Sequence, residues 1–194
     1  MRNKPFKISR SDALELFKQE IQLLENSIRN KGGRITNLNY AGSLRREKPE
    51  VGDLDGIIAT NDIDILRSAL EENNYNNIFS NLVCKKKISF GDKIIDLDLF
   101  VSENYNWGNT SLWSCGSEFF NVSFDKHLNQ NGYNRKLYKI YKENYDNDLN
   151  FKNEESIFKY FDLKFIEPKD RNIIGILKWT NIVYMTFLKR TVIS

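Results

Sequence analysis

The sequence predicts an α+β fold, in which a mixed β-sheet carries helices on one face and a small C-terminal α/β subdomain follows. Three observations lead to this prediction: a long helical repeat over residues 8–31, a β-hairpin pattern over 82–101, and an acidic pair heading an apolar run over 53–59. With 194 residues, of which 40% are hydrophobic, the chain can build one domain or two small subdomains with real cores.

Residues 8–31 have the spacing of an amphipathic helix. Their apolar side chains recur three or four positions apart, at Leu14, Phe17, Ile21, Leu24 and Ile28. Ser9 or Ser11 can cap the helix, and the glycines at 32 and 33 end it. A short strand over 35–40 and a turn at Gly42 and Ser43 come next.

A second helix is predicted over residues 62–73, followed by a hairpin with strands over 82–90 and 93–101. Gly91 and Asp92 form its turn. Because side chains alternate along a strand, Asp96 and Asp98 share one face of the return strand, opposite its apolar residues.

Asp53 and Asp55 are one residue apart at the start of the strand that continues to residue 59. They therefore point to the same side, where two carboxylates repel each other unless a cation lies between them. Oxygen ligands of this kind suit Mg²⁺. The acidic pair on the hairpin can lie beside them in one sheet, which predicts the carboxylate cluster that a two-metal site requires.

The composition excludes several kinds of site. One histidine, His127, cannot form a histidine-ligated zinc site, and Cys84 and Cys115 offer neither a disulfide framework nor zinc spacing. The chain begins without a secretory leader, so we expect an intracellular protein, cytoplasmic or nuclear. The net charge of +3 permits a polyanionic partner without requiring one.

The pattern changes after residue 103. We expect a loop at 106–108, a helix over 117–131, a short strand-and-helix set, and a break at 168–170. A boundary near 102–105 would separate residues 1–102 from 103–172, with 173–194 as a C-terminal extension of unknown role. Lys178 and the short apolar runs argue against a transmembrane span there. Docking on the protein's own core, an oligomer contact and attachment to a membrane surface stay open.

Three short motifs together resemble the nucleotide-binding signature of the family X DNA polymerases, the polymerase beta group. They are Gly42-Ser43, Arg45-Arg46 and Gly52-Asp53-Leu54-Asp55. The wider nucleotidyltransferase superfamily shares the Gly-Ser and Asp-x-Asp parts.

Later elements follow in the family's order. Asp98 lies 18 positions before Gly116, and Cys115-Gly116-Ser117 resembles the family's Thr-Gly-Ser turn. Gly132-Tyr133, followed by Tyr138, resembles the family's Gly-aromatic…Tyr element. The segment over 157–171 resembles the one that closes the family's polymerase domain. The resemblance covers roughly residues 7–172 and implies a nucleotidyltransferase palm followed by a C-terminal thumb subdomain.

The resemblance implies a role for each matching residue. Asp53, Asp55 and Asp98 would be the catalytic and metal-binding triad, holding two Mg²⁺ ions for which Mn²⁺ can substitute. The residues implied to contact the incoming nucleotide are Gly42, Ser43, Arg46, Gly52, Trp113, Gly116 and Asn121.

The chain also departs from the family. Trp113-Ser114 replaces the tyrosine-phenylalanine pair at the sugar of the nucleotide. The arginine that checks the template side falls at Asp125, which cannot donate to a base edge, so we expect low fidelity. About 40 residues precede Gly42, which implies no N-terminal lyase domain, as in the minimal members from large DNA viruses.

Without a DNA-clamping domain, contacts to the DNA backbone must come from basic surface. We expect these from Lys85, Lys86, Lys87, Arg135 and Lys136. Contacts of this kind give sequence-independent, salt-sensitive affinity.

The leading hypothesis is a monomeric DNA-directed DNA polymerase that takes dNTPs and gapped or primer-template DNA and fills short gaps in base excision repair. A nucleotidyltransferase that works without a template, on a nucleic-acid or small-molecule acceptor, is the second. A DNA-binding scaffold with an inactive site is the third, and the intact aspartates argue against it.

Overall fold

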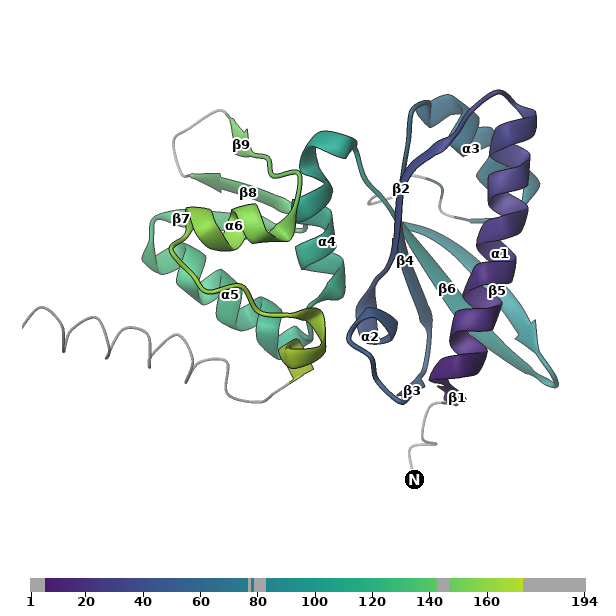
Figure 1. The fold of residues 1–194 in the computed structure, drawn as a ribbon, viewed down its shortest axis with the longest axis horizontal. Coiled ribbons are helices and arrows are strands. Elements are labelled where there is room, and N and C mark those ends of the chain that lie inside the picture. The colour runs from purple at the N-terminus through teal and green to yellow at the C-terminus, as the bar shows by residue number, and fades with distance from the viewer. Residues whose placement is uncertain (1–5, 77, 79–82, 143–146, 173–194) are drawn as a thin grey trace, which may run out of the picture.

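The computed structural model describes residues 6–76, 78, 83–142 and 147–172 (Figure 1). The predicted extension over 173–194 lies outside these residues. The first part of the chain contains β1 (Ile8–Ser9), α1 (Arg10–Asn30), β2 (Ile35–Tyr40), α2 (Gly42–Arg45), β3 (Glu50–Val51), β4 (Leu54–Thr60), α3 (Ile63–Glu72), β5 (Val83–Phe90) and β6 (Lys93–Val101).

A four-stranded mixed sheet organises this part, in the order β2-β4-β6-β5. The two central strands, β4 and β6, run parallel, whereas β2 and β5 pair antiparallel at the edges. The predicted α+β class with a mixed sheet is confirmed, as are the strands and the hairpin around Gly91.

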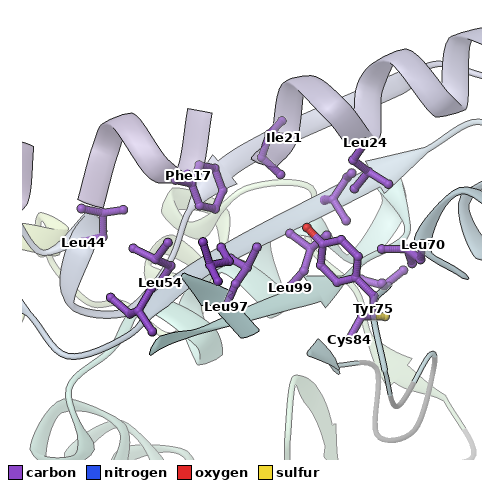
Figure 2. Packing of buried hydrophobic residues seen from close by; sticks show 14 of the residues in the cluster. Phe17, Ile21, Leu24, Leu44, Leu54, Leu70, Tyr75, Cys84, Leu97 and Leu99 are labelled. Atoms are coloured by element: carbon purple, nitrogen blue, oxygen red, sulfur yellow. The ribbon is translucent and has the colours of Figure 1, made fainter. Parts of the chain in front are cut away.

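Helices α1 and α3 pack on one face of this sheet (Figure 1). The Ser9 side chain caps α1 by accepting from the backbone N–H of Asp12, and Asp62 caps α3 in the same way. Figure 2 shows Phe17, Ile21 and Leu24 of α1 pointing onto Leu97 and Leu99 of the sheet. Burial of these side chains is the main stabilising contribution, at roughly 25 cal/mol per Å² of apolar surface.

The opposite face of the sheet, which we call the open face, carries the acidic side chains of β6. Along β6, Ile95, Leu97 and Leu99 are buried in the core, while Asp96 is exposed and Asp98 partly exposed on the opposite side. The predicted division of this strand into an acidic and an apolar face is therefore confirmed.

The second part of the chain has its own hydrophobic cluster, built on Leu112, Phe120, Phe124, Ile157 and Phe158. Its three-stranded antiparallel sheet has the order β7-β8-β9. The elements of this part are η2 (Asn104–Asn106), α4 (Trp107–Cys115), α5 (Glu118–Gln130), β7 (Tyr133–Lys136), β8 (Lys139–Lys142), β9 (Asp148–Leu149), α6 (Glu154–Tyr160) and η3 (Pro168–Asn172).

The loop predicted at 106–108 is wrong, because α4 begins at Trp107. This helix lies between the two hydrophobic clusters and buries polar side chains such as Asn109, Thr110 and Ser111. Asn109 satisfies its amide by donating to the carbonyls of Tyr138 and Leu149 and accepting from the N–H of Phe151. Because many of the buried positions of α4 are polar, the helix lacks the apolar stripe of an amphipathic helix. Its sequence therefore does not indicate a helix.

Cys84 and Cys115 are both buried, and neither forms a disulfide within the described part of the chain. Among the helices described here, none combines the length and the apolar character needed to cross a membrane.

Candidate active site

Asp55 and Asp98 face each other across the two central parallel strands, at paired positions of β4 and β6. Asp53 lies just before β4, on the same side. Burial raises the pKa of the Asp55 carboxyl to about 7, and the neighbouring charges of Asp53 and Asp98 add to this effect. The pKa of Asp53 is also raised, by burial and then by Asp98. The three predicted carboxylates thus form one mutually repelling group.

Gly42 brings the chain backbone onto the Asp55 carboxylate. Its φ of +51° lies in the left-handed region, and a Cβ atom at this position would sit 1.7 Å from Asp55 Oδ2. The backbone N–H of Ala41 donates to the Asp55 carbonyl at 2.8 Å, which holds the two segments together. Only glycine fits this approach. The turn predicted at Gly42 and Ser43 begins the one-turn helix α2.

The Ser43 hydroxyl is buried and lacks a hydrogen-bond partner among the described residues. Such a group costs free energy unless something bonds to it. Ser43 follows Gly42 and so lies beside the acidic group, where its hydroxyl could bond to a polar ligand. Gly52, the other predicted backbone donor, is exposed just before Asp53.

Arg46 is more enclosed than a surface phosphate ligand would be. Its guanidinium donates to the carbonyl of Cys115 at 2.5 Å and to the side chain of Asn172 at 2.9 Å. The Asn172 amide donates back to the Arg46 carbonyl. Burial lowers the Arg46 pKa, whereas the charges of Asp55 and Asp53 oppose that effect, so Arg46 lies within electrostatic reach of the acidic group.

The predicted nucleotide wall is assembled at the junction of α4 and α5. The Asn121 amide donates to the Trp113 carbonyl at 3.1 Å, and a Cβ on Gly116 would lie 2.8 Å from Asn121 Oδ1. The Trp113 ring meets Phe100 edge-on with centroids 5.2 Å apart. Phe100 is two residues beyond Asp98 on β6, so the wall stands next to the third carboxylate.

The predicted lysine patch on β5 is divided between the two faces of the sheet. Lys85 pairs with Asp98, and Lys87 pairs with Asp96 at 3.0 Å, both on the open face. Lys86 points the other way and pairs with Glu20 of α1, where both side chains are mostly buried. The prediction that Lys86 contacts DNA is therefore corrected, because side chains alternate along a strand.

Arg135 is likewise an interior residue. Its side chain is 4% exposed and donates to Asp125 at 2.6 Å and to Asn121 at 3.2 Å. A guanidinium committed in this way is not a surface contact for phosphate, so that prediction is corrected too. Lys136, the next residue, is exposed.

The fit of the acidic group to a cation can be judged from its donors. Hard carboxylate oxygens, repelling one another in a partly buried position, match what Mg²⁺ requires. Within the described residues, however, no group of three or more acidic, histidine or cysteine side chains is arranged so that it could hold a metal ion as it stands. At Asp98 the partner is instead the Lys85 ammonium. The donor chemistry fits Mg²⁺, and the side chains must adjust to bind it.

A buried ion cluster escaped the sequence analysis. Glu154 of α6 accepts from Arg45 at 2.5 Å and from Arg171 at 2.7 Å. Arg171 is fully buried, with its guanidinium 4.9 Å from the centre of the Phe120 ring. The cluster ties α2, next to the acidic group, to α6 and η3. The sequence gives no sign of this cluster, because an acidic residue at the start of a helix, such as Glu154, and a single arginine, such as Arg171, are both common.

Residues 110–172 match the family model of the DNA polymerase beta thumb. This thumb region, as we call residues 110–172, runs from within α4 to the end of η3 and includes Gly116, Asn121, Glu154 and Arg171. The match relates this region to the polymerase beta family. The search of curated proteins produced no match.

Proposed function

We propose that the chain is a DNA-directed DNA polymerase that adds dNTPs to a primer 3′-hydroxyl by two-metal nucleotidyl transfer and fills short gaps with low fidelity. The observation that carries this proposal is the pairing of Asp55 with Asp98 on adjacent parallel strands, with the Gly42 backbone against Asp55. The thumb match supports the polymerase class and, with it, DNA as the partner.

Asp53, Asp55 and Asp98 are the residues that would hold two Mg²⁺ ions. Bound there, the ions supply electrostatic stabilisation of the charge that develops on the attacking and leaving oxygens. Burial, followed by the charges of Asp53 and Asp98, raises the pKa of Asp55, and this supports the assignment because a bound dication would offset both effects. Asp98 would also accept the proton of the primer 3′-hydroxyl.

The neighbouring groups would position the nucleotide. The Ser43 hydroxyl and the backbone N–H groups of Gly42 and Gly52 suit phosphate oxygens. Arg46 would contribute positive charge from the junction with η3. Trp113, Gly116 and Asn121 would face the sugar and base, which places the reacting phosphate between the acidic group and the thumb region.

Template-independent transfer is the second candidate, and one pair of residues favours it. Asp125 occupies the position where the related family checks the template side with an arginine, and here it is bound to Arg135. An acidic side chain engaged in this way supplies no donor to a base edge. Loss of that check would relax dependence on the template.

Extension of a labelled primer on gapped, blunt-ended and single-stranded DNA, with Mg²⁺ and single dNTPs, separates the two candidates. The proposal predicts incorporation on gapped DNA that follows the templating base, together with a measurable rate of mispairing. Incorporation of equal rate on all three substrates would leave only the template-independent transferase. Absence of incorporation with either Mg²⁺ or Mn²⁺ would overturn both.

A further inference from the structure

Lys85 lies directly opposite Asp98 in the antiparallel pairing of β5 with β6. Its ammonium forms an ion pair with Asp98 Oδ2 on the open face of the sheet. The ion pair therefore engages Asp98, which is the one carboxylate of the group Asp53, Asp55 and Asp98 that comes from the β5–β6 hairpin.

A second lysine-aspartate pair stands two residues along the same strands. Lys87 and Asp96 are also register partners on the open face, 3.0 Å apart. Their side chains are 73% and 62% exposed, against 51% and 24% for Lys85 and Asp98. The two pairs have the same chemistry, and they differ in how near they lie to Asp55.

The position of Lys85 gives its charge a particular effect. Its ammonium lies close enough to Asp55 to lower the pKa of that carboxyl, against the stronger effects of burial and of the other aspartates. In the metal-free protein Lys85 thus provides part of the positive charge that the acidic group needs.

We propose that Lys85 is a positioning residue that occupies Asp98 until a divalent cation displaces it, and that it thereby sets how tightly the site takes up the cation. This inference rests on the proposed function, since it assumes that Asp98 is a metal ligand. An entering dication must break the Lys85–Asp98 pair and meets the repulsion of the nearby ammonium. Because Lys85 is half exposed, solvent weakens this repulsion, and we expect the ammonium to change cation affinity on the order of tenfold.

Binding of Mn²⁺ alone, followed by electron paramagnetic resonance of the free ion, tests the inference without any turnover. The variants are Lys85→Met, Lys85→Arg and the matched control Lys87→Met, each checked for folding by circular dichroism. We expect Lys85→Met to bind Mn²⁺ on the order of tenfold more tightly than the wild type. Lys85→Arg, which keeps the charge, should stay near the wild type, and Lys87→Met should differ by about twofold or less because its charge is farther away and more solvated.

Equal affinities for Lys85→Met and Lys87→Met would overturn the inference, since the effect would then be one of net charge. Weaker binding by Lys85→Met would also overturn it. Asp55→Asn distinguishes this from a failure of the proposed function. If Asp55→Asn weakens Mn²⁺ binding while Lys85→Met and Lys87→Met bind Mn²⁺ with equal affinity, the metal site is supported and the proposed role of Lys85 is wrong. If Asp55→Asn binds Mn²⁺ as the wild type does, both the proposed metal site and the role of Lys85 are wrong.

Discussion

Asp55 and Asp98 occupy paired positions on the two central strands of the sheet, so two acidic side chains from distant parts of the chain share one small region. The arrangement is unfavourable by itself, since like charges in a partly buried site destabilise one another. Beside this pair lie the Ser43 hydroxyl, which has no hydrogen-bond partner among the described residues, and Gly42, where any Cβ would collide with Asp55. These three features together are the physical reason to assign chemistry to the site.

Asp55→Asn should stabilise the metal-free protein, and the gain should grow with pH. The folded pKa of about 7 lies above the value of about 3.9 for an unperturbed aspartate, so the folded state binds more protons between these values and loses stability as pH rises through them. At pH 8 the penalty is on the order of 4 kcal/mol. Urea unfolding in EDTA at pH 8 and pH 5 measures it, with Asp96→Asn as control. A gain at pH 8 no larger than the gain at pH 5 would contradict this account.

Gly42→Ala should abolish nucleotide incorporation, because its Cβ would collide with the Asp55 carboxylate. Gly91→Ala is the matched control: its φ of +59° imposes similar backbone strain, and a Cβ there meets nothing within 4 Å. Both should lose about 1 kcal/mol of stability through that strain, while Gly91→Ala alone keeps its incorporation rate. Equal loss of activity in the two variants would show that strain, and not the collision, matters.

Glu154→Gln should destabilise the protein by roughly 3–5 kcal/mol, because Arg171 and Arg45 would keep buried charges without their shared partner. Denaturant unfolding gives this value directly. Asp96→Asn, which breaks the exposed pair with Lys87, should cost about 1 kcal/mol or less by the same method. A cost for Glu154→Gln no larger than that would mean that the buried cluster does not join α2 to the thumb region.

Lys86→Met and Lys87→Met should separate stability from DNA affinity. Lys86 is paired with Glu20 in a mostly buried position, so its loss leaves an uncompensated carboxylate and lowers stability. Lys87 is exposed on the open face, and its loss should reduce the slope of log affinity against log salt by up to about 1. Titration of gapped DNA at several salt concentrations checks this. A larger change of slope in Lys86→Met than in Lys87→Met would refute the division between faces.

The acidic group could be predicted because its placement depends on short-range rules. Alternation along a strand predicts that Asp53 and Asp55 point to one side, and likewise Asp96 and Asp98. The choice of Asp98 within the second pair is what the resemblance to the family X polymerases implies, through the spacing to Gly116. The same alternation divides the lysines at 85–87 between two faces. The prediction of one basic cluster at these lysines did not take this alternation into account. The turn at Gly91 also sets the register that pairs Lys85 with Asp98.

The contacts between distant segments could not be predicted in this way. Glu154 meets Arg45 across 109 positions of the chain, and Arg46 meets Asn172 across 126. No local periodicity encodes such pairs, and the polar burial of α4 hides the element that separates the two hydrophobic clusters. These features depend on how the two parts of the chain pack against each other.

The most direct test of the central claim compares Asp98→Asn with Asp96→Asn in single-turnover dNTP incorporation on gapped DNA with Mg²⁺. The two residues lie on the same face of β6, two positions apart, and the substitutions are identical. The account predicts that Asp98→Asn loses roughly a thousandfold or more in rate, the scale of one lost transition-state contact of about 4 kcal/mol, while Asp96→Asn stays within a few-fold of the wild type. A similar rate for the two variants would contradict the assignment of Asp98 as the third carboxylate of the site.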